Sequence, residues 1–196
     1  PPAPRGWSVA PGLACGAAGR VGAGGWLGAI GSRSLYPAAT VDNAPVLVAA
    51  ELVAGNAMLN PVWDPTSSGV VVFVGTNPVV SHGYGTALPD PIMRLREFRA
   101  AGGRVCVVDP RRTESARLAD HHLAVRPGTD HLVLAALVRE LLVDGADAHE
   151  MATACDADDL HALRAAVEPF TIDAVAGAAD VDAGLLREMV ADVRAR

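Results

Sequence analysis

Three short segments of the sequence contain residue types that bind phosphate, and the first and third of them also contain glycine. They are Gly75–Pro78, Asp109–Arg112 and Arg126–Asp130. Glycine lets a ligand approach the backbone closely, free backbone N–H groups bind phosphate oxygens, and arginine offers a forked pair of charged donors. Arg111, Arg112 and Arg126 would together supply three such cations. The residue types therefore predict a binding site for a pyrophosphate.

Two acidic residues in these segments could recognise a nucleoside. Asp109 could accept hydrogen bonds from ribose hydroxyl groups, and Asp130 could accept two parallel bonds from the N1–H and N2–H edge of a guanine. Each also has a structural interpretation, because Asp109 could end a strand, Thr129 or Asp130 could cap the next helix, and the arginines could form a solvated turn. His82 is either a phosphate donor or a turn residue.

The elements that precede these segments determine where they lie. We predict strands at Val70–Val74, Arg104–Val108 and His122–Val125, and helices at Pro91–Ala101 and His131–Val143. The first two strands contain unbroken runs of apolar, mainly β-branched residues, which are typical of strands buried on both faces of a parallel sheet. Right-handed crossover connections make the strands parallel, so the carboxyl ends of all three strands lie at one edge of the sheet. The three segments follow these carboxyl ends and therefore share that edge. This pattern predicts a doubly wound, Rossmann-like α/β fold with a mainly parallel sheet and helices on both faces.

Helices are also predicted on either side of this core. Leu13–Ile30 and Ala44–Gly55 precede it, and Asp42 is placed to cap the second of them. Beyond Asp144 we predict short helices at residues 147–155, 156–167, 171–176 and 182–194. We therefore divide the chain into an α/β domain, residues 1–145, and a helical extension, residues 146–196.

The composition argues against several classes of protein. The net charge is −6 and all 16 basic residues are arginine, which disfavours a nucleic-acid partner and removes every mechanism that needs a lysine. Cys15, Cys106 and Cys155 match neither a disulfide framework nor a CxxC metal spacing, and the histidines show no metal-ligand pattern. No run reaches the roughly 18–20 apolar residues of a transmembrane segment.

The stretch from Val70 to Leu142 resembles the cofactor-binding core of the molybdopterin oxidoreductases. This family comprises the formate dehydrogenases, nitrate reductases and dimethyl sulfoxide reductases. The stretch contains, in order, a G-T-N-P turn, a D-P-R-R-T segment and an R-P-G-T-D turn, a specific combination. Weaker resemblance extends to residues 30–45 and to Glu168–Thr171. The resemblance implies that the chain is a portion of a molybdopterin-dependent oxidoreductase, incomplete for catalysis by itself.

In that family, two molybdopterin guanine dinucleotides hold a molybdenum or tungsten ion through their dithiolene groups, and the metal changes oxidation state during the reaction. The resemblance implies that this chain binds the guanosine and pyrophosphate of one of them. By matching motif, the phosphate side would comprise Gly75, Thr76, Asn77, Pro78 and His82, the guanosine-pyrophosphate side Asp109, Arg111 and Arg112, and the guanine end Gly128, Thr129 and Asp130. No catalytic residue follows from the match.

The resemblance also implies partners. These are the remaining domains of the same enzyme and an electron-transfer subunit or domain, and an iron–sulfur cluster is expected only in an N-terminal part that this sequence lacks. Because the sequence starts at Pro1 without an initiator Met, we expect it to be a piece of a longer protein. We expect a cytoplasmic location, with a periplasmic one left open.

The chain departs from the family where many members carry the Cys, selenocysteine or Ser that ligates molybdenum. The corresponding segment, Tyr36–Asn43, has no Cys; Thr40 or Ser34 would be the oxygen ligands at hand, and some members use no protein ligand. The missing Cys favours an alternative, a structural subunit without cofactor that resembles the large peripheral subunit of respiratory NADH–quinone oxidoreductases. Retention of Arg111 and Arg112 favours the cofactor-binding interpretation. An unrelated Rossmann-type nucleotide binder is a third alternative.

Overall fold

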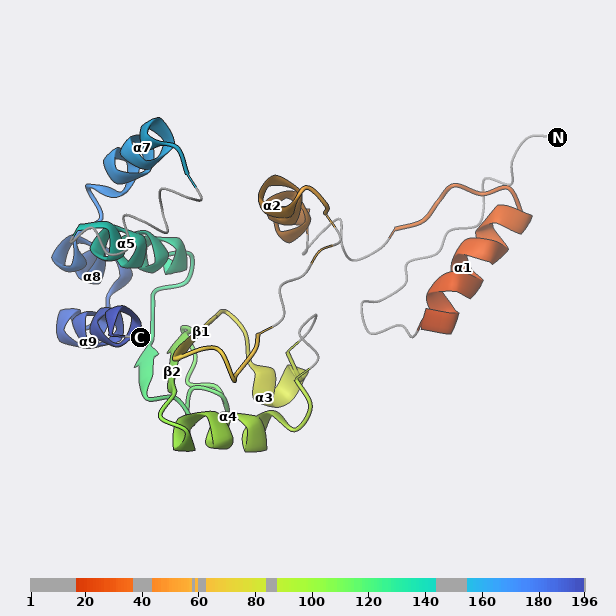
Figure 1. Cartoon of the computed structure of the whole chain (residues 1–196). Helices are drawn as coiled ribbons and strands as arrows, with labels where there is room; N and C mark the ends of the chain where they lie inside the picture. Colours follow the sequence, from red (N-terminus) through yellow and green to blue (C-terminus); the bar gives the residue numbers. More distant parts are fainter. Residues whose placement is uncertain are drawn as a thin grey trace. The chain divides into compact units, whose positions relative to one another are not determined.

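The structure is a computed structural model of the whole chain, and it describes residues 17–36, 44–57, 59, 63–83, 88–143 and 155–195. Its contacts divide the chain into two compact units, Pro1–Pro61 and Val62–Arg196. Figure 1 labels the helices and strands of both units. The predicted domain boundary at residues 145 and 146 falls among residues outside those described, so that boundary stays a prediction.

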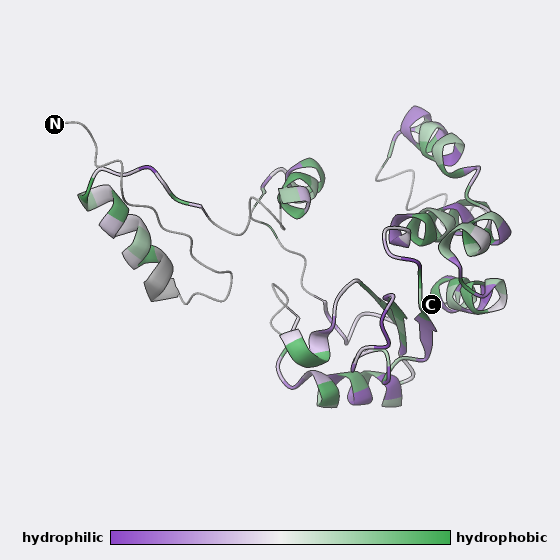
Figure 2. Ribbon diagram, turned by 180° about the vertical axis from the view of Figure 1, so that it is seen from behind, coloured by the Kyte–Doolittle hydropathy of each residue, from purple (hydrophilic) through white to green (hydrophobic). Residues whose placement is uncertain are grey.

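The first unit contains two helices. Helix α1 covers Ala17–Ala29 and helix α2 covers Ala44–Ala54, close to the predicted ranges, while the predicted cap at Asp42 lies outside the described residues. Gly55 ends α2 in the left-handed conformation, with a φ of +69°, and its N–H donates to the carbonyl of Glu51. Figure 2 shows α2 as predominantly hydrophobic, and its large apolar side chains are exposed.

The second unit is built on a parallel sheet of three strands in the order β1-β2-β3. Strands β1, Val70–Val74, and β2, Arg104–Val108, pair along their full lengths and have the predicted bounds. Strand β3 covers His121–Leu123, so the prediction of His122–Val125 was wrong at both ends. The pairing explains the difference: β3 lies against Cys106–Val108 only, and no neighbouring strand continues the ladder beyond Leu123 within the described sheet.

Helices cover both faces of this sheet, which confirms the predicted α/β class. On one face, Cys106, Val108 and Leu123 pack with three helices, which are α5, Asp130–Val143, α8, Ile172–Ala179, and α9, Ala183–Arg194. On the other face, Val105 and Val107 pack with α4, Pro91–Ala100. Figure 1 shows α4 and α9 on different sides of the strands. Alternate residues of β2 thus enter two separate cores, as the unbroken apolar sequence of that strand predicted.

An aromatic cluster fills the α4 side of the sheet. Trp63 meets Phe73 and Phe98 edge to face, with ring centroids 6.0 and 5.1 Å apart, respectively. Gly103 lies directly on the Phe98 ring, and a β-carbon at that position would approach the ring to 2.5 Å. The turn between α4 and β2 therefore requires glycine at position 103 for space and at position 102, where φ is +92°, for conformation.

The C-terminal helices are part of the same unit as the sheet. They are α7, Ala157–Val167, α8, Ile172–Ala179, and α9, Ala183–Arg194. Asp156, Thr171 and Asp182 cap them by accepting hydrogen bonds from backbone N–H groups in the first turn, as their positions in the sequence predicted. The predicted helix at 147–155 falls almost entirely outside the described residues. Among the described helices, none is long and apolar enough to cross a membrane.

Candidate functional site

Each strand of the sheet leads at its carboxyl end into one of the three segments predicted to bind the pyrophosphate and nucleoside. We call the residues 75–83, 109–115 and 124–130 the β1, β2 and β3 loops. The N–H of Gly75 donates to the Val108 carbonyl over 2.9 Å, and the N–H of Asp109 donates to the Leu123 carbonyl over 3.1 Å. These bonds continue the parallel ladder past the strands. The three loops therefore start side by side at one edge of the sheet, as the sequence predicted.

Two glycines in these loops have a conformation and surroundings that suit a bound ligand. Gly75 has a φ of +59° and Gly128 a φ of +84°, values that L-residues with a side chain rarely adopt. A β-carbon placed on either glycine would meet no heavy atom within 4 Å. The space beside both backbones is open, so their conformation rather than crowding by the protein accounts for the choice of glycine.

The β1 loop is tied to the β2 loop through Asn77. Its amide Nδ2 donates to Oε2 of Glu114 over 2.7 Å, and its Oδ1 accepts from both the N–H and the Oγ of Ser115, over 3.1 and 2.6 Å. Ser115 Oγ in turn accepts from the N–H of Val79 over 3.1 Å. Sequence reasoning did not identify Glu114 or Ser115, because nothing in the sequence indicates which residues 37 and 38 positions apart will meet.

The remaining predicted residues of the β1 loop surround a short helix, α3, which covers Pro78–Ser81. Thr76 is half-buried and Pro78 is buried at the start of α3. His82 ends α3 in the left-handed conformation, its N–H donates to the Pro78 carbonyl, and its own carbonyl accepts from Leu88 N–H. Its exposed ring has no hydrogen-bond partner within the described part of the chain. The backbone of His82 thus forms a turn, and its predicted role as a phosphate donor stays a prediction.

The β2 loop presents its arginines to solvent. One carboxylate oxygen of Asp109 accepts the Arg111 N–H over 2.8 Å and shapes the turn. Arg111 and Arg112 are exposed, and neither forms an ion pair with any described residue. The pKa of Glu114 lies below its usual value because its own backbone N–H and the Asn77 amide hydrogen-bond the carboxylate, with smaller contributions from Arg111 and Arg117.

The β3 loop is fixed mainly by its own turn. The backbone N–H and the Oγ1 of Thr129 both donate to the Arg126 carbonyl, over 3.1 and 2.6 Å. The Arg126 N–H donates to the carbonyl of Ala179 over 2.8 Å, which attaches the loop to the end of α8. Asp130 is the first residue of α5 and is half-buried, and its carboxylate has no partner in the described parts of the chain. The Thr129 hydroxyl is therefore used within the turn, whereas the Asp130 carboxylate is available.

The described residues contain no group of three or more His, Cys, Asp or Glu side chains arranged to hold a metal ion. Of the oxygen ligands considered from the sequence, Ser34 is half-exposed and Thr40 lies outside the described residues. Cys106 is buried in β2, where desolvation, together with Asp192 and Asp120, raises the pKa of its thiol to about 12. This thiol stays protonated at neutral pH.

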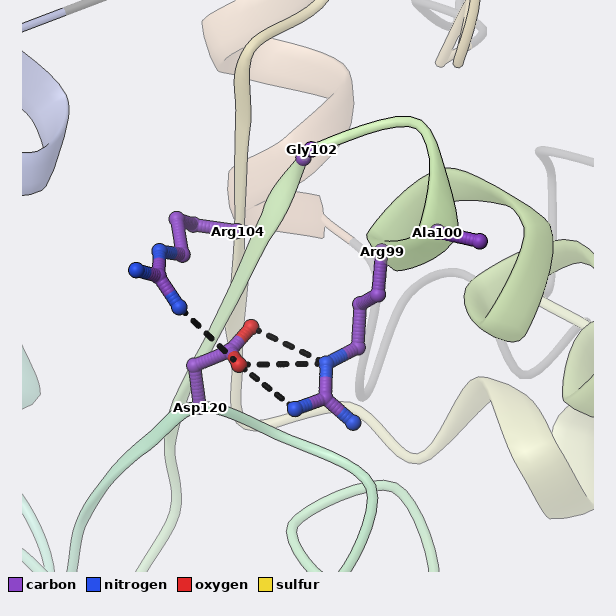
Figure 3. A pocket seen from close by; sticks show the side chains of 6 residues that line it. Arg99, Ala100, Gly102, Arg104 and Asp120 are labelled. Carbon is purple, nitrogen blue, oxygen red and sulfur yellow. Dashed lines mark hydrogen bonds and ion pairs between the residues drawn. The ribbon is translucent and has the colours of Figure 1, made fainter.

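Charged residues at the opposite edge of the sheet are paired with one another. An open cavity of about 450 Å³ lies there. Figure 3 shows Arg99 and Arg104, which line it, converging on Asp120. Asp120 accepts from Arg99 Nη2 over 2.6 Å and from the Val105 N–H over 2.9 Å. Burial disfavours the charged form of Asp120, but these hydrogen bonds outweigh burial and lower its pKa. The cavity thus holds internally compensated charges, in contrast to the arginines of the β2 loop.

Comparisons with known proteins identify relatives by both sequence and fold. No family model matches the chain. The chain is 28% identical over 166 residues to formate dehydrogenase H of Escherichia coli (strain K12). This match covers 81% of this chain and 21% of that enzyme. The chain is also 30% identical over 131 residues to a nitrate reductase of Klebsiella oxytoca. This match covers 66% of this chain and 13% of that enzyme.

The structure is similar to acetylene hydratase from Pelobacter acetylenicus, with a TM-score of 0.65 and 22% sequence identity, over 86% of this chain and 22% of that one. This likeness shows a shared fold. The chain spans about a fifth or less of the length of each of these proteins.

Two curated enzymes of one family match it over most of its length, and the motifs that carried the resemblance lie at one edge of its sheet. The chain thus resembles the molybdopterin oxidoreductases in sequence, as its motifs predicted.

Proposed function

We propose that the carboxyl edge of the sheet binds the guanosine and pyrophosphate of one molybdopterin guanine dinucleotide, and that the chain is in this way a portion of a molybdopterin-dependent oxidoreductase. Relatives of the chain are molybdenum or tungsten enzymes, which implies a pterin cofactor. One observation carries the proposal. Three loops leave a single sheet edge with arginine and aspartate side chains that form no ion pair with a described residue.

The β1 and β2 loops supply the donors for the pyrophosphate. Within the described part of the chain, the backbone N–H groups of Thr76, Asn77 and Arg112 donate to no protein acceptor. The guanidinium groups of Arg111 and Arg112 add charged donors in a forked geometry that matches phosphate oxygens. Gly75 keeps the backbone open to a bulky anion on this side. These groups fit a diphosphate and, because they are exposed, bind it without displacing an internal ion pair.

The β3 loop supplies the acceptor for the guanine. The free carboxylate of Asp130 has the two oxygens needed for the N1–H and N2–H groups of the base. Gly128 lets the ring system approach the backbone, and the bonds of Thr129 to the Arg126 carbonyl hold the loop in this shape. The second carboxylate oxygen of Asp109 is available for a ribose hydroxyl, since only the first bonds to Arg111 N–H. Each end of the nucleotide therefore has a partner of matching chemistry.

When bound, the cofactor supplies the dithiolene sulfurs that hold the metal and allow two-electron redox chemistry. The residues described above bind and orient the nucleotide tail. The remaining domains of the enzyme and an electron-transfer partner would complete the catalytic centre. A purely structural subunit would have no need of two exposed arginines at this edge. That Arg111 and Arg112 form no ion pair with a described residue supports retention of the cofactor.

The decisive experiment is a chemical analysis of the purified protein. Elemental analysis by mass spectrometry should find molybdenum or tungsten in stoichiometric amount, and acid hydrolysis should release guanosine monophosphate. As a control, the same preparation should contain no adenosine or cytidine nucleotide in that amount. Folded protein free of both metal and guanine nucleotide would contradict the proposal and would favour the structural subunit.

A further inference from the structure

We propose that Asn77, Glu114 and Ser115 form a hydrogen-bonded clasp that fixes the β1 loop against the β2 loop, so that the Asn77 side chain positions the phosphate donors and does not itself bind the ligand. The proposal rests on the function proposed above, because it concerns the same sheet edge. It differs from the role that the family motif suggests for Asn77, which is to line the phosphate side directly. Asn77 and Glu114 are positioning residues in this account.

The hydrogen bonds of the clasp nearly exhaust the Asn77 amide. Oδ1 accepts two bonds, both from Ser115, and an amide oxygen has two lone pairs. Nδ2 donates to the Glu114 carboxylate. A carboxylate accepts hydrogen bonds, so it can pair with the nitrogen of the amide but not with its oxygen. The orientation of the amide is therefore fixed by both partners. One N–H is left for any other acceptor, so Asn77 is poorly suited to grip a phosphate with its side chain.

Ser115 replaces Asn77 in the role that asparagine usually has at this position. Asn77 is the N-cap residue of α3, where an asparagine side chain commonly accepts from the first turn, yet it makes no capping bond. Instead Ser115 Oγ, which is completely buried, accepts the N–H of Val79 from the other loop. The hydroxyl donates to Asn77 at the same time. Because Ser115 of the β2 loop caps the start of α3, the Asn77 amide is not needed as a cap and can form the clasp.

The clasp sets the separation of the groups that would hold a diphosphate. The free N–H groups of Thr76 and Asn77 are on one side of it, and Arg111 and Arg112 precede Glu114 by three and two residues on the other. A diphosphate contacts both loops at once, so binding is favoured when the donors are fixed before the ligand arrives. The Asn77 amide also neutralises part of the Glu114 charge, which would otherwise oppose an anion at this edge.

The test measures the affinity of the purified protein, freed of any bound cofactor, for two probes, guanosine diphosphate and guanosine. The variants are Asn77→Ala, Glu114→Ala, both together, and Glu114→Gln. Glu114 is partly exposed, so its variants should fold. We expect Glu114→Ala to weaken guanosine diphosphate binding about tenfold, the effect of one hydrogen bond to a charged group. Asn77→Ala should weaken it at least as much, because it also removes the two bonds from Ser115. The double variant should lose no more than Asn77→Ala alone, since Asn77→Ala already breaks the bond to Glu114.

Two further results distinguish positioning from general destabilisation. Glu114→Gln should bind within about twofold of the wild type, because its side-chain oxygen can still accept from Asn77. Guanosine binding should be unchanged in all variants, since its contacts lie on the β3 loop and Asp109. Glu97→Ala is the matched control: it removes an exposed carboxylate that pairs with Arg94 on α4, away from the clasp, and should change neither affinity.

The possible failures are separate. A wild-type protein that does not bind guanosine diphosphate would overturn the proposed function itself. If the wild type binds but Glu114→Ala binds equally well, the clasp is overturned. Additive losses in the double variant would show that Asn77 acts independently of Glu114, as a direct ligand of the phosphate would, and would overturn the clasp. Equal losses for guanosine and guanosine diphosphate, with a lowered Tm, would show that the cluster only supports the fold.

Discussion

Replacing Arg111 and Arg112 together by alanine tests whether the β2 loop binds the cofactor's pyrophosphate. Both side chains are exposed and form no ion pair with a described residue. Their removal should therefore change the free energy of unfolding by less than about 0.5 kcal/mol, as is usual for surface positions. The same change should remove two charge-assisted hydrogen bonds to the ligand. Stability and binding should respond independently.

The expected loss of affinity follows from the exposure of the two guanidinium groups. A hydrogen bond involving a charged group contributes about 1.5–3 kcal/mol, and solvent-exposed groups lie at the lower end of this range. Two bonds at about 1.5 kcal/mol give about 3 kcal/mol, which corresponds to a loss of affinity of roughly a hundredfold. Rising salt concentration should also lower the affinity of the wild type more steeply than that of the variant, because the variant lacks two of the charges that attract the anion.

Titration calorimetry with guanosine diphosphate at several salt concentrations measures both effects. The matched control is Arg94→Ala with Arg96→Ala, which removes the same charge from exposed positions of α4. The control should keep wild-type affinity within about twofold, because screening weakens interactions beyond a Debye length. Equal losses in the two double variants would show that net charge alone accounts for binding. Unchanged affinity in the Arg111 and Arg112 variant would refute their assignment.

Three further predictions concern the second unit. Gly103→Ala should destabilise the protein by about 1–3 kcal/mol in urea denaturation, because the new methyl group would clash with the Phe98 ring; an unchanged midpoint would contradict that packing. The pKa of Asp120 is lowered by folding, so its stabilising contribution is complete above the usual value of 3.8 and is lost as the pH falls through the lowered value. Asp120→Asn should therefore flatten the decline in unfolding free energy toward about pH 3, and a decline as steep as in the wild type would argue against this ion-pair network. Cys106 should resist alkylation by iodoacetamide in the folded protein and react after unfolding, because its buried thiol has a pKa raised to about 12; modification of Cys106 at the rate of an unfolded peptide would contradict its burial.

The sequence predicted the sheet well where local composition alone determines the structure. The valine-rich runs in Val70–Val74 and Arg104–Val108 contribute side chains to the cores on both faces of the sheet, so their bounds could be read from hydrophobicity. The bounds of β3 could not, because the edge strand ends where pairing with β2 ends, and this depends on a partner distant in sequence. The division of contacts after Pro61 also depends on tertiary packing, which no local pattern indicates.

The candidate site shows the same limit. Strand order and parallel direction bring the three loops to one edge, and this much follows from the sequence pattern. The sequence does not show which polar groups the protein uses for itself. Asn77 is engaged by Glu114 and Ser115, and the Thr129 hydroxyl by the Arg126 carbonyl, whereas Arg111, Arg112 and Asp130 are available. Only the three-dimensional contacts separate residues that support the site from those that can bind a ligand.

Hydrogen–deuterium exchange with and without guanosine diphosphate tests the central claim most directly. The account predicts that the ligand slows backbone exchange in the β1, β2 and β3 loops, including the free N–H groups of Thr76, Asn77 and Arg112. Exchange around Arg99, Arg104 and Asp120 at the opposite edge should not change. Protection confined to that opposite edge, or absent from all three loops at saturating ligand, would contradict the assignment of the carboxyl edge as the nucleotide site.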